Sequence, residues 1–236
     1  MFGLEGTIAN SLAVILGGAI GLAFKKGIPE KIKDSSLKAV GLVTAYIGIS
    51  GCLCGKNTLV VVISMVMGVV IGELLRLDDG VNKLGAFLEN KVSKGKKKSN
   101  IAHGFVSSSL LFCVGAMTIV GSLQAGLEGD CKVLYIKSVL DFCSSIIFGA
   151  TFGVGVLFSA AFIFIYQGSI TLLSSFVSPL LTDSVVNEMN CVGYIIIIAL
   201  ALNIIGVTKL KVMNMVPAIF LPIAIIPIYN WIAALL

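Results

Sequence analysis

A few polar residues lie inside long apolar stretches of this sequence, where they could bind or carry a solute. Asp141 is the only carboxylate well inside such a stretch, and Lys137 precedes it by one helical turn. A charge at the centre of a bilayer costs about 3 kcal/mol on insertion scales, so it needs a partner or water. Two interpretations follow: a local Lys137–Asp141 pair near the outer membrane surface, or an Asp141 that takes part in function.

Three further kinds of polar side chain extend this candidate pathway. Gln167 carries a carboxamide that can donate and accept at once, so it either binds solute or joins helices. Asn203 has the same two interpretations, and helix packing is the favoured one. Ser144 and Ser145 follow Asp141 by about one turn and would extend a polar stripe on the same helix face.

The elements that must position these residues are membrane helices. The chain is 57% hydrophobic and 12% charged, whereas soluble domains are about 25% charged. A bilayer core about 30 Å thick needs roughly 20 helical residues. The sequence therefore predicts an all-α polytopic membrane protein, a single transmembrane domain over 1–236 with about eight spans. These are expected at 6–24, 39–54, 58–75, 105–122, 138–156, 158–179, 191–208 and 213–235.

The positive charges predict an orientation for these spans. If all eight cross, alternate gaps hold 14 and 3 of the 17 lysine and arginine residues. Cytoplasmic loops carry the excess of positive charge. The N- and C-termini are therefore expected outside.

One pair of spans has no charged residue to orient it. Residues 142–182 contain no charge, and Gly153-Val154-Gly155 is the expected turn. The alternative is one span plus a re-entrant segment, which is tolerated only when buried in protein. A tight hairpin is favoured because it keeps the alternation of charge.

The hydrophilic stretch 78–104 has two interpretations. Its apolar residues recur at helical spacing, which fits an amphipathic helix on the inner membrane surface; a solvated linker is the alternative. Its basic tail would bind anionic lipid headgroups. The residues expected there are Lys91, Lys94, Lys96, Lys97 and Lys98.

Glycine patterns suggest repetition and broken helices. Gly17-x-x-x-Gly21 and Gly68-x-x-x-Gly72 each precede a basic residue by four positions, which fits either a duplicated helix hairpin or the general abundance of glycine in membrane helices. The spans at 39–54 and 105–122 look short and glycine-interrupted, a pointer to a transporter binding site. The glycines expected to line the path are Gly48, Gly51, Gly115 and Gly121.

Several function classes lack support in the sequence. No catalytic triad, zinc-protease motif or phosphate loop is present, so no enzyme, metal or cofactor is expected. The net charge of +5 lies beside apolar spans and is not a nucleic-acid signal. A disulfide is conceivable among the cysteines expected near the outer face, which are Cys52, Cys54, Cys131 and Cys191.

The chain also resembles a known family. The stretch from Phe105 to Asp130, the run from Lys137 to Asp141 and the run from Tyr166 to Leu172 resemble the YqgA/YdfK-like bacterial membrane proteins, a domain of unknown function numbered 554. The resemblance covers essentially the whole chain; Phe142 departs from it, where a glycine is expected. It implies a bacterial inner-membrane location and suggests transport, without a substrate.

Two functions are therefore expected from different classes. The first is a membrane transporter or channel-like carrier for a small solute or ion, lined by Asp141, Gln167 and Asn203. The second is a non-transporting scaffold or regulator, in which the polar groups hold helices together. A small glycine-rich bundle also predicts a homo-oligomer in the lipid bilayer.

Overall fold

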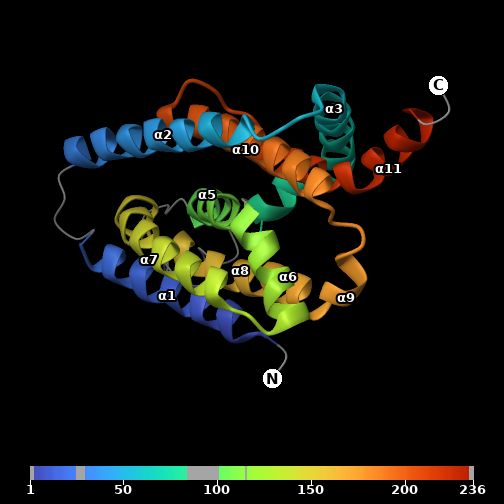
Figure 1. Cartoon of the computed structure of the whole chain (residues 1–236). Helices are drawn as coiled ribbons and strands as arrows, with labels where there is room; N and C mark the ends of the chain where they lie inside the picture. The colour runs from blue at the N-terminus through green and yellow to red at the C-terminus, as the bar shows by residue number, and fades with distance from the viewer. Residues whose placement is uncertain (1–2, 25–29, 84–100, 115, 234–236) are drawn as a thin grey trace. The chain divides into compact units, whose positions relative to one another are not determined.

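The computed structural model describes residues 3–24, 30–83, 101–114 and 116–233. These residues form helices and connecting turns, without a β-strand. The elements in chain order are α1 (Glu5–Phe24), α2 (Glu30–Cys52), α3 (Thr58–Leu75), α5 (Ile101–Cys113), α6 (Ala116–Glu128), α7 (Lys132–Phe152), α8 (Gly155–Leu172), α9 (Ser174–Val177), α10 (Asp183–Ile205), the 3₁₀ helix η1 (Val212–Phe220) and α11 (Pro222–Ala233) (Figure 1).

The predicted all-α membrane fold is confirmed by the length and composition of these helices. Five of the described helices are long and apolar enough to cross a bilayer, and two bent pairs, α5 with α6 and η1 with α11, raise this to as many as seven. The part of α2 from Lys38 to Cys52 is a shorter apolar helix. The count of eight and the placement of the termini stay predictions.

Packing divides the chain into two compact units, each described here by itself. Unit 1 covers residues 1–37, 79–113 and 117–175, and unit 2 covers 38–78, 114–116 and 176–236. Unit 1 therefore contains α1, α5, α6, α7 and α8, and unit 2 contains the apolar part of α2 with α3, α10, η1 and α11. The single domain over 1–236 stays a prediction.

In unit 1, α1 and α7 pack in parallel at very short range. A Cβ on Gly17 would collide with the backbone of Phe142, and one on Gly21 would collide with the carbonyl of Ile146. Glycine removes the side chains that would keep two backbones apart, which lets membrane helices gain dispersion contacts. The Gly17-x-x-x-Gly21 motif is therefore a contact face for α7.

The uncharged stretch 142–182 forms a tight hairpin, as the charge alternation predicted. Helix α7 ends at Phe152, Gly153 takes a positive φ of 83°, and α8 begins at Gly155. Glycine populates this backbone region without a Cβ penalty. Helix α8 then returns antiparallel to α1, since Gly18 lies against Leu157 and Gly168 lies near Leu4.

Helices α5 and α6 form one bent pair. The axes of Ile101–Cys113 and Met117–Glu128 meet at 63°. Helix α5 runs alongside α8 in the same direction, because Gly155 at the start of α8 abuts Ile101 and Phe105. The stretch expected as a broken span at 105–122 is therefore a bent helix pair, and its crossing of the bilayer stays a prediction.

Unit 2 contains a second bent pair, η1 and α11, which meet at 42°. Pro217 lies within η1 and Pro222 opens α11, and proline removes a backbone donor and bends a helix. Helix α3 packs antiparallel on η1, with Gly68 against Ala218 and Gly72 against Asn214.

The expected break at 39–54 is wrong, because α2 is a continuous helix to Cys52. Gly48 abuts the α10 backbone at Tyr194 and Ile198, and a Cβ on Gly51 would enter the Tyr194 ring. These two glycines let α2 and α10 pack closely and antiparallel, so their function here is packing.

Candidate solute site in unit 1

The centre of the candidate site is a buried ion pair on α7. The Lys137 ammonium donates to Asp141 Oδ2, and these side chains are 7% and 10% exposed. This confirms the pairing expected from their spacing. Helix α7 begins at Lys132, six residues earlier than predicted, so Asp141 lies about 13 Å along a 21-residue helix.

Helix α1 presents three polar side chains to the interior of unit 1. Thr7 and Asn10 are fully buried and Ser11 is 8% exposed. Their spacing of three and four residues places them on one helix face. The Asn10 carboxamide approaches the Asp141 carboxylate, but neither of its polar atoms reaches hydrogen-bond geometry with any described group.

Helix α8 brings a second carboxamide. Gln167 is fully buried, and both its Nε2 and its Oε1 lack a hydrogen-bond partner among the described residues. Thr171, one turn further along, is 2% exposed with an unpartnered hydroxyl. A Cβ on Gly168 would lie 4.0 Å from Cγ2 of Thr7. Helix α8 therefore packs on α1 next to Thr7.

The break between α5 and α6 lies beside the same groups. Cys113, the last residue of α5, is within electrostatic range of both Lys137 and Asp141. Across the break, the Thr118 hydroxyl donates to the Phe112 carbonyl at 3.2 Å. A broken helix frees backbone carbonyls, and this bond satisfies one of them.

Unit 1 therefore contains a buried ion pair with one unpartnered carboxamide, Asn10, close to it, and a second unpartnered carboxamide, Gln167, on helix α8 where it packs on α1. Buried polar atoms almost always have a protein or water partner. An unpartnered group costs about 1–3 kcal/mol. Two buried carboxamides with unused donors and acceptors can bind water or a polar solute that supplies the missing partners.

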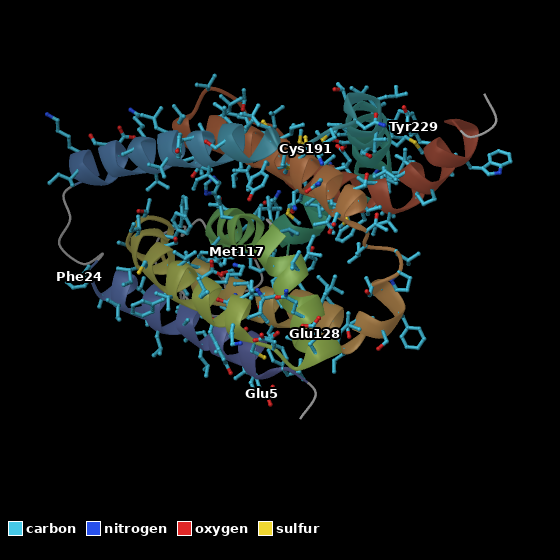
Figure 2. The ribbon with its side chains drawn as sticks, viewed as in Figure 1. Glu5, Phe24, Met117, Glu128, Cys191 and Tyr229 are labelled. Carbon is cyan, nitrogen blue, oxygen red and sulfur yellow. The ribbon has the colours of Figure 1, made fainter. Side chains whose placement is uncertain are left out.

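A pocket of about 430 Å³ opens at the end of unit 1 where α1 and α7 begin. The labelled Glu5 and Glu128, at the start of α1 and the end of α6, lie at this same end (Figure 2). The pocket has mixed polar and apolar walls. Its lining residues are Gly3, Glu5, Gly129, Asp130, Cys131, Lys132 and Tyr135. Thr7 and Lys137 lie two residues further along α1 and α7 than the lining residues Glu5 and Tyr135.

Asp130, in the loop beside this pocket, is held in its charged form. The backbone N–H of Lys132 donates to its carboxylate at 3.0 Å, and the Lys132 ammonium lies 3.3 Å from it. Both contacts lower the pKa of Asp130 below its ordinary value, the backbone bond most. The mouth of the pocket therefore keeps a negative charge next to an exposed positive one.

Ser144 and Ser145, expected to extend the polar stripe of α7, differ in their burial. Ser145 is buried, and its hydroxyl donates to the Phe142 carbonyl at 2.8 Å, where α7 meets Gly17 of α1. Ser144 is half-buried. Among the three serines of α5, Ser108 donates to the Gly104 carbonyl at 2.5 Å, which is the local bonding that serines often make in membrane helices.

Asn203 lies in unit 2 and shapes a turn there. Its Oδ1 accepts from the Thr208 hydroxyl at 2.7 Å and from the Leu210 N–H at 2.9 Å, and its Nδ2 donates to the Leu210 carbonyl at 2.8 Å. These bonds close the turn that follows α10. The bonds are local to this turn and do not join Asn203 to another helix, and they leave Asn203 little capacity for a solute.

The remaining expected residues divide between packing and segments outside the described residues. Gly121 of α6 abuts Val133 and Leu134 of α7, which is a packing contact. Gly115 and the lysines at 91–98 lie outside the described residues, as does most of 78–104. Residues 77–83 are helical, so the expected amphipathic helix is described only at its start.

Sequence reasoning missed a buried carboxylate in unit 2. Glu188 was expected in a loop, but α10 begins at Asp183 and Glu188 is 1% exposed. The missed signal is Thr182, whose hydroxyl accepts from the Val185 N–H as a helix N-cap. Threonine followed by an acidic residue is typical of a helix start.

Comparisons with known proteins agree with a membrane protein. The model of the family described as "Protein of unknown function (DUF554)" matches residues 5–227. The chain is 34% identical over 225 residues to the "Uncharacterized membrane protein YdfK" of Bacillus subtilis (strain 168), covering 94% of this chain and 95% of that protein. It is 31% identical over 219 residues to the "Uncharacterized protein YqgA" of Escherichia coli (strain K12), covering 92% and 93%. No solved structure matches the chain.

Proposed function

This chain belongs to the DUF554 family, and from that premise we propose that it is a carrier or channel for a small solute or ion in the bacterial inner membrane. The observation that supports this most is two buried, unpartnered carboxamides in unit 1: Asn10, which approaches the Lys137–Asp141 pair, and Gln167 of the neighbouring helix α8. Polar groups inside membrane helices face pathways or cavities. The bent helix pair α5–α6 is a further feature that transporters share.

The charge of the site favours one class of solute. Lys137 and Asp141 neutralise each other, so the interior has no net charge to attract a bare cation or anion. The unused hydrogen-bonding capacity belongs to carboxamides and hydroxyls, which both donate and accept. We therefore favour a small polar solute that is uncharged or zwitterionic, entering through the pocket at the start of α1 and α7.

The test is solute flux into proteoliposomes. Purified protein is reconstituted, and stopped-flow light scattering follows entry of glycerol, urea and glycine, while a potential-sensitive dye follows Na⁺ and K⁺. We expect flux of at least one of the first three, and we expect Asp141→Asn and Gln167→Leu to abolish it. Each change removes a polar group that the solute would contact.

A matched control is Glu73→Gln. It makes the same carboxylate-to-amide change in a half-exposed pair with Lys211, in unit 2, and should leave flux unchanged. Wild-type flux in both Asp141→Asn and Gln167→Leu would remove this site from the mechanism. Flux of Na⁺ or K⁺ alone would contradict the proposed uncharged or zwitterionic solute, but it would still support a carrier or channel function.

A second candidate is a non-transporting scaffold or regulator. Asn203 favours it, because its three bonds hold a turn and leave little capacity for a ligand. The two candidates predict opposite results for Gln167→Leu. If Gln167 joins helices, the variant unfolds at lower temperature in detergent; if it binds solute, stability is kept and flux is lost, because the side chain has no partner among the described residues.

The proposal includes no enzymatic activity, cofactor or metal. It includes assembly as a homo-oligomer, because small membrane bundles bury further surface by association. It also includes contact of Lys91, Lys94, Lys96, Lys97 and Lys98 with anionic lipid headgroups. Multi-angle light scattering in detergent tests the first, and binding to vesicles with and without phosphatidylglycerol tests the second.

A further inference from the structure

The turn between α2 and α3 in unit 2 is held on one side of α10 by two thiols. The Cys54 Sγ donates to the Asn187 carbonyl at 3.4 Å, and the Cys191 Sγ donates to the Cys52 carbonyl at 3.1 Å. Cys191 is labelled on α10 in Figure 2. The two thiols thus make reciprocal bonds between the same turn and the same stretch of helix.

Helix geometry places these two sulfur atoms at the same level. In an α-helix the carbonyl of residue i points toward the N–H of residue i+4. A thiol bound to the Asn187 carbonyl therefore lies beside Cys191. The next residue agrees: a Cβ on Gly55 would lie 2.6 Å from the Cys191 Sγ and 2.9 Å from its Cβ, so the chain just after Cys54 touches Cys191.

The third cysteine of this region points elsewhere. The Cys52 Sγ donates at 3.2 Å to the carbonyl of Ile49, one turn back in its own helix. Its backbone carbonyl accepts from the Cys191 thiol, and the electrostatic interaction of Cys191 with Cys54 is larger than that with Cys52. Cys54 is therefore the partner that the geometry selects for Cys191.

A buried carboxylate fixes the turn in this position. Glu188 Oε1 accepts the backbone N–H groups of Lys56 at 2.7 Å and Asn57 at 2.8 Å. These donors precede α3, so the carboxylate lies at a helix N-terminus, where the dipole favours negative charge. Glu188 thereby holds Cys54 against α10 in the reduced protein.

Metal binding does not account for this cluster. In the described part of the chain, no group of three or more histidine, cysteine, aspartate or glutamate residues is arranged to hold a metal ion. All six cysteines are free thiols. The remaining chemistry for two adjacent thiols is oxidation.

We propose that Cys54 and Cys191 form a dithiol site that an oxidant of the disulfide or azo class converts to an intramolecular disulfide. Two S–H bonds break and one S–S bond forms. The two electrons and two protons pass to the oxidant, so that a disulfide becomes two thiols or an azo compound becomes a hydrazine. The inference is independent of the proposed transport.

The reaction should become faster as pH rises. Burial raises the pKa of the Cys54 thiol above its ordinary value, and the thiolate is the reactive form. The fraction of Cys54 thiolate is therefore small at neutral pH and grows through the alkaline range. Oxidation is best tested at pH 8.5, with pH 7 as the comparison.

The experiment is oxidation of the reduced, detergent-purified full chain with the azo oxidant diamide. Remaining thiols are alkylated, the protein is digested without reduction, and linked peptides are identified by mass spectrometry. We expect a Cys54–Cys191 peptide from the monomer band, faster at pH 8.5, that dithiothreitol removes. In a sample unfolded in SDS before alkylation, Cys143, which is a free thiol, should be alkylated completely and reports that the thiols were reduced and the reagent active.

Three variants make the result decisive. Cys52→Ser is the matched control and should keep the link, because its thiol is directed away from Cys191. Cys54→Ser and Cys191→Ser should each abolish it. A Cys52–Cys191 link in the wild-type protein, a link between two copies, or no link while Cys143 reacts fully would each overturn the proposal, and none of these readings depends on a variant folding.

Discussion

The buried pair on α7 allows a double-mutant cycle whose size follows from its burial. Lys137→Met leaves Asp141 uncompensated, and Asp141→Leu leaves Lys137 uncompensated, in side chains only 7% and 10% exposed. Removing one partner of a buried pair typically costs about 3–5 kcal/mol. Each single variant should therefore unfold with a free energy lower by about that amount.

The double variant should recover most of this loss. Replacing a whole buried pair with apolar side chains of similar volume is often neutral, or stabilising by about 1–4 kcal/mol. Lys137→Met with Asp141→Leu should thus approach wild-type stability, giving a coupling energy of several kcal/mol. The measurement is the free energy of unfolding on titration with SDS in mixed micelles, followed by far-UV circular dichroism.

The same double variant separates stability from transport. It should be folded and show no solute flux, because the polar site is gone. If it is as unstable as the sum of the two single variants, the two charges have separate partners and the pairing argument fails. If it is stable and keeps wild-type flux, the pair is structural and does not contribute to the path.

Further predictions concern packing and hydrogen bonding. Gly21→Leu would force a side chain into the Ile146 carbonyl and should destabilise the packing of α1 on α7 by about 1–3 kcal/mol or more. The control Gly80→Ala adds a methyl group that meets nothing within 4 Å, so it should be neutral or slightly stabilising. Thermal unfolding in detergent compares the two variants. Asn203→Ala removes three bonds of one turn and should cost about 1–2 kcal/mol, seen as a lower melting temperature; an unchanged value would mean that the turn holds itself. Glu188→Ala leaves two backbone N–H groups without an acceptor and should lower the free energy of unfolding by about 2–3 kcal/mol. Glu188→Gln keeps an acceptor and should lower it less. Equal losses in the two variants would show that the charge of Glu188 matters more than its role as an acceptor.

The sequence predicted those parts of the fold that hydrophobicity and helix spacing determine. The apolar stretches predicted the membrane helices, and the absence of charge around Gly153 was correctly interpreted as a hairpin. The spacing of four residues predicted the Lys137–Asp141 pair. The start of this helix was predicted six residues too late, because Lys132 and Lys137 were taken as lying before the span, whereas the helix includes both.

Tertiary contacts explain what the sequence could not predict. Gly48 was expected to interrupt its helix, yet α2 continues through it and α10 packs against it. Whether a glycine breaks a helix or lets another helix approach depends on its neighbours in space. In the same way, the role of Asn203 depends on Thr208 and Leu210, which donate hydrogen bonds to its Oδ1 and hold it in the turn after α10.

The tight α7–α8 turn also has a consequence for how the protein is made. Gly153 and Val154 provide no hydrophilic loop, so the translocation machinery meets no polar segment at which α7 could stop before α8 follows. The two helices should therefore enter the bilayer as one hairpin. Lys137 and Asp141 would then be inserted as a neutral pair, formed within one turn of α7, which lowers the cost of moving either charge into lipid.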